Sequence, residues 1–378
     1  MTATLFGTRK NNFDAIRFLL ATLVIASHSY PLLRGSNACE PISLLTGGQL
    51  TGGEMAIDGF FALSGFLIVQ SWQRSRGALQ YFTKRILRIY PGFLVAVLFG
   101  AFVVGPRIAT DAFAYWNQFS ATGSLSSTLN LDPRLPKVFA NLPVPAVNGS
   151  LWSIRYEFLC YIGAALMGLA GAFRYRFAIL ISFAICMALH AGQIYFGLAL
   201  PSGGMSAVFC DPGPWPRLAA FFLSGVLFHL YVDCIPHSAR LAWIALAGIV
   251  FSAADQFQML PLVLPICGTY LLFYVAYLPI PRLDRFASRG DFSYGLYLYA
   301  FPIQQWLVHR YGDSLTPITL FLAAFPLTIL LAAISWRCVE SPFLIRRSVR
   351  ATESKTQSPK RKTYYLVAPR PMTVSAMK

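Results

Sequence analysis

Long runs of apolar residues, broken by short polar connections, recur from one end of the chain to the other. A helix of about 20 apolar residues crosses the ~30 Å hydrocarbon core of a bilayer, and these runs have about that length. Proline and glycine interrupt several runs, which neighbouring helices accommodate in a bundle. The pattern predicts an all-α polytopic membrane protein, a bundle of about ten transmembrane helices. We place them at 13–33, 56–73, 91–106, 151–171, 177–197, 215–232, 240–256, 260–280, 291–311 and 315–337.

The lysine and arginine residues are divided unequally between alternate connections. If the N-terminus lies inside, about 23 of them fall in inside connections and about 6 in outside connections. This asymmetry predicts that both termini are cytoplasmic. The first run contains ionisable residues and has no small-residue cleavage signal, so we expect it to be a retained span rather than a signal peptide.

Composition supports the membrane assignment and excludes other classes. Hydrophobic residues make up 56% of the chain and charged residues only 12%, which is too few to cover a soluble surface. The net charge of +16 follows membrane topology rather than a nucleic-acid footprint, so no nucleic-acid partner is expected. The 7 cysteines form no CxxC pair and no Cys/His ligand spacing, so we expect no metal site. No bound cofactor is expected either. Cys39 and Cys210 both fall in outside connections, where they could pair.

The chain divides into a membrane domain and a tail. Residues 1–345 form the integral membrane domain, and residues 346–378 are basic and polar, typical of a disordered cytoplasmic tail that can touch anionic lipid. The longest outside connection, 107–150, is rich in Ser, Asn, Pro and Thr, and we expect an irregular lid or binding loop there.

Ionisable residues inside spans are costly and mark candidate sites. Arg17 and His28 are eleven residues apart, so they share one face of a helix about 16 Å apart along its axis, with Arg17 nearer the cytoplasm. Asp14 lies one turn from Arg17. Glu157 enters from the outside and is expected at the depth of His28, where a carboxylate would orient the imidazole as a general base. A purely structural role for these residues remains an alternative.

Other candidates have structural alternatives of similar weight. Lys84, Arg85 and Arg88 share a helical face, as in an interfacial helix or a phosphate clamp. Asp58 and Ser64 lie in a glycine-containing run in which the glycines permit close helix approach and the serine can bond across helices. The remaining candidates are interfacial anchors or site residues: Trp152, Arg155, Ser293, Tyr294 and Tyr297.

Six short markers stand along the chain in a fixed order. Together they resemble the membrane-bound acyltransferase-3 family, whose members include O-antigen and exopolysaccharide acetylases of bacteria, and the resemblance covers residues 10–345. The markers are 13–17 (FDAIR) with His28, 58–66 (DGFFALSGF), 85–91 (RILRIYP), 149–157 (GSLWSIRYE), 293–298 (SYGLYL) and 340–342 (ESP).

The resemblance implies transfer of an acyl group, usually acetyl, from cytoplasmic acyl-CoA to a hydroxyl of a cell-surface polysaccharide, O-antigen or lipid-linked glycan precursor. It implies a multi-pass protein of the bacterial inner membrane, with acetyl-CoA as co-substrate. His28 with Glu157 are the expected catalytic residues, as base or acyl carrier. Arg17, Arg85 and Arg88 are expected to bind the donor, and Ser64 or Tyr297 to donate to the oxyanion. Supporting roles fall to Asp14, Asp58, Trp152, Arg155 and Ser293.

Two departures from the family pattern bear on mechanism. Many members have a second histidine where this chain has Ala300, which makes His28 the principal candidate. Many also carry an extracytoplasmic SGNH-type domain, which we do not expect in this chain. Any second transfer step is therefore expected to need another protein.

Two other function classes remain as alternatives. A transporter or flippase of a glycan or lipid-linked sugar would also place Arg, His and Glu within spans. A non-catalytic partner of polysaccharide biosynthesis proteins would not depend on His28.

Overall fold

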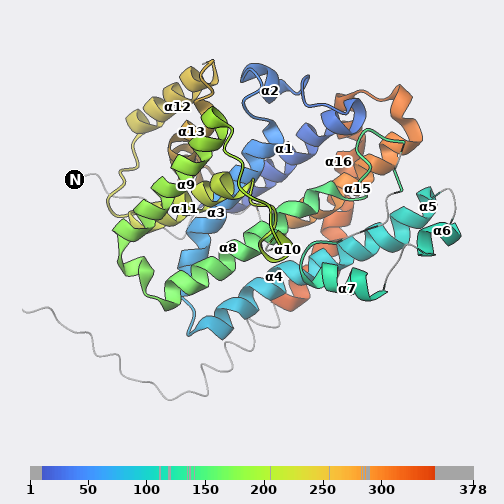
Figure 1. Cartoon of the computed structure of the whole chain (residues 1–378), viewed down its shortest axis with the longest axis horizontal. Helices are drawn as coiled ribbons and strands as arrows, with labels where there is room; N and C mark the ends of the chain where they lie inside the picture. Colours follow the sequence, from blue (N-terminus) through green and yellow to red (C-terminus); the bar gives the residue numbers. More distant parts are fainter. Residues whose placement is uncertain are drawn as a thin grey trace, which may run out of the picture.

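The computed structural model describes residues 11–109, 112–117, 121–133, 141–204, 206–254, 256–281 and 290–344, together with 135, 138, 139, 283 and 286. The described residues form helices and connections, without a strand among them. The predicted tail at 346–378 lies outside the described residues. In Figure 1, α1, α3, α8 and α4 cross the view obliquely, α12 and α13 lie at one edge, and α5 to α7 lie at the opposite edge.

Every predicted span overlaps a helix, and the chain is a membrane protein. Five helices are long and apolar enough to cross a bilayer: α1 (Phe13–Arg34), α3 (Gly52–Gln73), Ala78–Ile108, α9 (Arg176–Phe196) and Pro317–Leu344. Shorter apolar helices follow at α11 (Trp215–Leu230), α12 (Ala239–Ala253) and Leu260–Ala276. The last of these is divided into α13 (Leu260–Val263), η4 (Leu264–Gly268) and α14 (Thr269–Ala276). The remaining two, α8 (Trp152–Leu169) and α15 (Ser293–Tyr311), carry the most polar site residues.

The third span begins earlier than predicted. A start at residue 91 is wrong, because α4 (Ala78–Leu98) already contains Pro91 and continues through the π-helix η1 (Phe99–Val104) into α5 (Gly105–Ile108). A proline inside a membrane helix is tolerated when neighbouring groups satisfy the freed carbonyl. Next to Pro91, Tyr294 Oη donates to the Ile89 carbonyl oxygen at 2.9 Å, which ties this part of α4 to α15. Lys84, Arg85 and Arg88 therefore lie on the early turns of a long helix rather than on a separate interfacial one.

Glycines allow α3 and α11 to pack backbone to backbone. A Cβ on Gly65 would lie 1.9 Å from the Phe222 carbonyl oxygen, and one on Gly225 would lie 1.9 Å from that of Ala62. Such contacts are possible only without a side chain. The expected close helix approach at 58–66 is confirmed. Ser64, next to Gly65, lies where it can contact α8.

Helix α1 is central to the bundle. It packs against α3, α15 and α16 (Pro317–Ser335), which continues as the π-helix η7 (Trp336–Glu340). A capping box starts α3: Thr51 Oγ1 accepts from the Glu54 backbone amide at 3.1 Å, and Glu54 accepts from the Thr51 amide at 3.0 Å. These contacts fix the residue at which α3 begins.

One expectation about the connections is wrong, and one possibility that was left open is decided. The segment 107–150 is not uniformly irregular, because it contains α6 (Ala112–Asn117), α7 (Ala121–Leu129) and the 3₁₀ turn η2 (Gly149–Leu151). Cys39 and Cys210 do not pair: both thiols are free, the first exposed and the second buried. Other short elements are α2 (Pro41–Leu45), η3 (Ala172–Arg174), α10 (Ser206–Phe209) and η6 (Gly312–Ser314).

Candidate functional site

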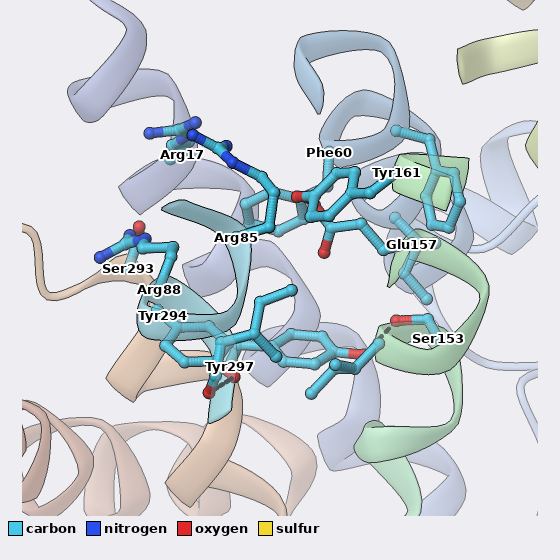
Figure 2. Close-up of a pocket in the computed structure, with 14 residues that line it drawn as sticks. Arg17, Phe60, Arg85, Arg88, Ser153, Glu157, Tyr161, Ser293, Tyr294 and Tyr297 are labelled. Atoms are coloured by element: carbon cyan, nitrogen blue, oxygen red, sulfur yellow. Dashed lines mark hydrogen bonds between the residues drawn. The ribbon is translucent and has the colours of Figure 1, made fainter. Parts of the chain in front are cut away.

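A cavity opens within the bundle among α1, α3, α4, α8 and α15. Figure 2 shows the cations Arg17, Arg85 and Arg88 on one side of it and Glu157 and Ser153 on the other. It therefore joins a cationic end to a wall of hydroxyl and carboxylate groups. Its lining is completed by Ile57, Phe60, Phe61, Ile89, Ile154, Tyr161, Ser293, Tyr294 and Tyr297.

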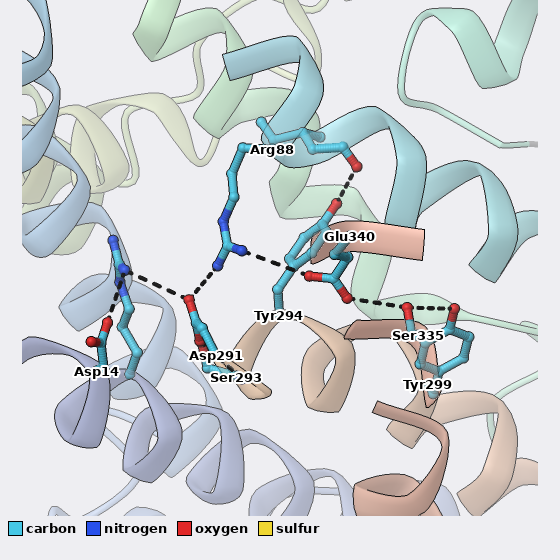
Figure 3. Close-up of polar contacts among 10 residues, drawn as sticks. Asp14, Arg88, Asp291, Ser293, Tyr294, Tyr299, Ser335 and Glu340 are labelled. Atoms are coloured by element: carbon cyan, nitrogen blue, oxygen red, sulfur yellow. Dashed lines mark hydrogen bonds and ion pairs between the residues drawn. The ribbon is translucent and has the colours of Figure 1, made fainter. Parts of the chain in front are cut away.

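Two of the three cations are ion-paired. Arg88 bonds to the Asp291 carboxylate and lies 3.7 Å from Glu340 Oε2, while Arg17 lies 3.7 Å from Asp14 and 3.9 Å from Asp291 (Figure 3). Three carboxylates thus surround two guanidinium groups. Because charges removed from water need partners, this network compensates both arginines without a ligand.

The network continues beyond the ion pairs. Ser335 Oγ donates to Glu340 at 3.1 Å and accepts from Tyr299 Oη at 3.2 Å. Asp291 Oδ1 accepts from the backbone amide of Ser293 at 3.2 Å and from its hydroxyl. These contacts tie α4, α15 and η7 together around the Arg88 side chain (Figure 3).

Arg85 differs from the other two cavity arginines. Its Nη2 donates to Ser71 Oγ at 3.2 Å, and its guanidinium lies 5.8 Å from the centre of the Tyr161 ring. Its Nε is buried without a hydrogen-bond partner, and no carboxylate of the described residues forms an ion pair with it. Among the described residues of the cavity wall, Arg85 is the cation whose charge is not compensated by an acid.

The expected contact between Glu157 and His28 does not form among the described residues. Glu157 Oε1 instead accepts from Ser64 Oγ at 3.0 Å and from Tyr161 Oη at 2.5 Å. Tyr161 lies one turn further along the same helix, so helical spacing favours this partner over a side chain on α1. The prediction that Ser64 bonds across helices is confirmed, with α8 as its partner helix.

The hydroxyl groups expected at the oxyanion are engaged elsewhere. Tyr297 Oη donates to the Ser150 carbonyl oxygen, and Ser153 Oγ lies 2.6 Å from the same phenol. Ser64 already donates within the Glu157 cluster. In this arrangement neither hydroxyl has a free proton for a developing negative charge, and the Tyr297 contacts instead close the cavity toward the first turn of α8.

His28 is half-buried on α1 and lies outside the cavity lining. Its ring meets that of Phe301 edge-on, with centroids 5.4 Å apart, and its buried Nδ1 has no hydrogen-bond partner. Ala300, where many similar proteins have a second histidine, is buried in an apolar cluster with Ala21 and Ile25. The described part of the structure therefore leaves this imidazole without a polar partner.

The other predicted residues lie in two further places. Asp58 is 2% exposed and lies 3.5 Å from Arg217 on α11, which also pairs with Glu54 at 3.0 Å. Trp152 and Arg155 face away from the inner cavity and line a second, outer pocket. The structure thus gathers the three arginines, Glu157, Ser293 and Tyr297 in one cavity, and Asp14 and Ser64 contact two of these lining residues. It separates the other candidates from the cavity: His28, Asp58, Trp152 and Arg155.

Several residues of the cavity and its network are absent from the sequence-based candidates. Asp291 and Glu340 pair with Arg88, and Tyr161 and Ser153 line the wall. Glu340 opens one of the six markers, and Asp291 stands two residues before another. The markers at these two acids contain no basic residue that could pair with them. An acid in or beside such a marker therefore indicated a basic partner elsewhere in the chain.

Comparison with known proteins adds a family and two relatives. A family model described as an acyltransferase domain matches residues 10–337. The chain is 26% identical to "O-acetyl transferase" of Shigella phage Sf6 over 348 residues, covering 90% of this chain and 98% of that protein. It is 24% identical to "Nodulation protein 10" of Rhizobium leguminosarum bv. viciae over 371 residues, covering 90% and 94%. No solved structure matches.

Proposed function

The chain belongs to the acyltransferase-3 family, and on that premise we propose that it transfers an acyl group, most simply acetyl, from cytoplasmic acyl-CoA to a sugar hydroxyl. The acceptor is a cell-surface polysaccharide, O-antigen or lipid-linked glycan precursor, and the protein acts in the bacterial inner membrane with ten spans and both termini cytoplasmic. The observation that carries the proposal is the inner cavity, whose wall presents a guanidinium with no acidic partner among the described residues.

Donor binding is assigned to Arg85 first. The phosphates of CoA carry negative charge, and a guanidinium binds phosphate oxygens through charge-assisted hydrogen bonds. Arg85 reaches the cavity with a buried Nε that has no hydrogen-bond partner. Arg17 and Arg88 contribute to the electrostatic potential and the shape of the cavity rather than to direct phosphate binding, because their charges are already compensated by three acids.

The acyl group is transferred near His28. The acceptor oxygen attacks the thioester carbonyl carbon while its proton passes to the imidazole; the new C–O bond forms as the C–S bond breaks, and the CoA thiolate leaves and takes up a proton. A half-buried imidazole whose Nδ1 has no partner in the described structure can accept that proton. Arg17, the α1 residue in the cavity lining, and His28 lie at opposite ends of that helix. The donor therefore stays inside while its acyl end extends outward.

The same imidazole can also act as an acyl carrier. In that form a ring nitrogen attacks the thioester first, and the acyl-imidazole then passes the group to the acceptor oxygen. Incubating purified protein with radiolabelled acetyl-CoA and no acceptor separates the two forms. Label retained on wild-type protein and lost in His28→Ala indicates the carrier, whereas no retained label indicates the base.

Mass spectrometry of the cell-surface glycan tests the function. Cells lacking the gene are compared with cells expressing wild type, His28→Ala, or the control His309→Ala, which alters an exposed histidine at the outer end of α15. We expect one acyl increment with wild type and with the control, and none with His28→Ala at equal amounts of protein in the membrane. An ester of equal abundance in all strains would contradict the proposal and leave the transporter alternative.

A further inference from the structure

A second pocket of about 350 Å³ opens beside the first turn of α8. Its size falls in the range of about 300–1,000 Å³ typical of small-molecule sites. None of its residues lines the inner cavity. It is lined by Leu131, Asp132, Pro133, Asn148, Gly149, Leu151, Trp152, Arg155, Tyr156, Ser206, Cys210 and Asp211.

The chemistry of this pocket suits a sugar. Trp152 is 40% exposed and meets Tyr156 edge-on, with ring centroids 5.5 Å apart, so the lining includes an open aromatic surface. Asp132 and Arg155 are paired at 3.3 Å beside it. A sugar has an apolar C–H face that packs on an aromatic ring and hydroxyls that bond to polar groups at its edge. Because the guanidinium already has a carboxylate partner, the site favours hydroxyl groups over a phosphate.

The backbone around the pocket is strained at two points. Leu131 has φ +56° and Cys210 has φ +65°, and both are non-glycine residues that line the pocket. A left-handed conformation at such residues costs free energy and persists where the surrounding structure holds it, often at ligand sites. Tyr156 Oη supports this backbone by donating to the Asp211 carbonyl oxygen at 2.8 Å.

Contacts connect this pocket to His28. A Cβ on Gly149, in the pocket wall, would lie 2.7 Å from the Phe301 ring, and the same ring meets His28. Asn148 is anchored by a 2.8 Å hydrogen bond from its amide to the Leu298 carbonyl oxygen. A single aromatic ring therefore separates the pocket wall from the imidazole.

The first turn of α8 also separates this pocket from the inner cavity. Ser153 lines the inner cavity, whereas its neighbour Trp152 lines the outer pocket. One turn of helix thus presents side chains to both spaces. A donor in one space and an acceptor in the other would meet at the end of α1 that carries His28.

We propose that the outer pocket is the acceptor subsite, holding one sugar residue against Trp152 with its hydroxyls on Asn148 and the Asp132–Arg155 pair. Its reactive hydroxyl reaches His28 past the edge of Phe301. The assignment rests on the proposed function, since it supplies the second substrate of that transfer.

The test uses full-length protein in native membranes, with radiolabelled acetyl-CoA as donor. The acceptor probe is cell-surface glycan from the gene-deletion strain, treated with alkali to remove esters. Trp152→Ala is compared with Trp152→Phe, Asp132→Asn and the control Trp243→Ala, which alters an exposed tryptophan on α12. We expect Trp152→Ala to raise the KM for glycan about tenfold, with the KM for acetyl-CoA unchanged, and Trp152→Phe to recover most of that loss.

Asp132→Asn should raise the KM for glycan severalfold, because it removes the partner of Arg155, and Trp243→Ala should behave as wild type. The acceptor assignment is overturned if Trp152→Ala and Asp132→Asn leave the KM for glycan unchanged, or if they change the KM values for glycan and acetyl-CoA equally. The proposed function stands in either case. A wild-type protein that labels no glycan overturns both.

Discussion

The two ends of helix α1 treat their ionisable groups in opposite ways. At one end Arg17 belongs to a network in which Asp14, Asp291 and Glu340 surround two guanidinium groups. At the other end His28 packs against an aromatic ring, and its Nδ1 has no partner in the described structure. The difference indicates two kinds of work: paired charges hold the helices in place, whereas groups without partners remain available to a substrate. Arg85 bonds to Ser71 but has no acidic partner among the described residues, so its charge also remains available, although it lies beside the paired network.

Replacing His28 should have the largest effect on catalysis. His28→Ala removes the proposed base or carrier, and losing such a group lowers the rate by about 10²- to 10⁴-fold. The rate of acetyl transfer to de-esterified glycan in membranes measures this, with thermal unfolding of the purified variant as control. Unchanged unfolding with lost transfer would sharpen the contrast, and a rate equal to that of wild type would remove His28 from the mechanism.

Replacing Asp291 should chiefly affect stability. Asp291→Asn leaves Arg17 and Arg88 without a shared carboxylate, and removing one partner of a buried pair costs about 3–5 kcal/mol. The arginine side chains keep 28% and 25% exposure, so we expect about 3 kcal/mol. Thermal unfolding in detergent gives the measurement, with exposed Asp313→Asn as the matched control. Equal stability of the two variants would show that the network does not hold the helices.

Replacing Arg85 should weaken donor binding while leaving the fold intact. A hydrogen bond to a charged group contributes about 1.5–3 kcal/mol, so Arg85→Ala should raise the KM for acetyl-CoA roughly 10- to 150-fold. Arg85→Lys keeps the charge but loses the planar guanidinium, so its KM for acetyl-CoA should lie between those of wild type and Arg85→Ala. Exposed Arg76→Ala is the control. If wild type and the three variants have the same KM for acetyl-CoA, Arg85 does not bind the donor, and Arg88 becomes the candidate.

Replacing Glu157 should have the smallest effect of the four. In Glu157→Gln the amide would keep an oxygen that accepts from Ser64 and Tyr161, so this variant should reduce transfer less than about tenfold. A loss as large as that of His28→Ala would indicate that the two residues act as a unit during the reaction. Comparing the two rates at saturating donor decides this.

Much of the fold follows from local pattern. Apolar runs locate the helices, and helical spacing correctly places Arg17 beside Asp14. The start of α4 was missed because Pro91 marks a break in most helices, whereas in this bundle α4 continues through it. The pattern alone contains no information about the neighbouring helices that pack around it.

The candidate cavity was only partly accessible from the sequence. Arg17 stands out because cations are rare in apolar spans, and Arg85 and Arg88 stand out because they share a helical face. The structure places all three on one cavity. Their partners do not stand out in the same way. Arg88 and Asp291 are 203 positions apart, and Glu157 bonds within its own helix and to α3 rather than to α1.

By itself the sequence determined that this chain is a helical membrane protein of the acyltransferase-3 type, because hydrophobic length, charge asymmetry and short markers are properties of local segments. Only the tertiary structure decided which arginine keeps an uncompensated charge among the described residues, what Glu157 bonds to, and that Trp152 and Ser153 face different spaces. Those outcomes depend on how each helix is rotated and how closely it packs. That is set by contacts between residues far apart in the chain, such as the glycine contacts that bring α3 against α11.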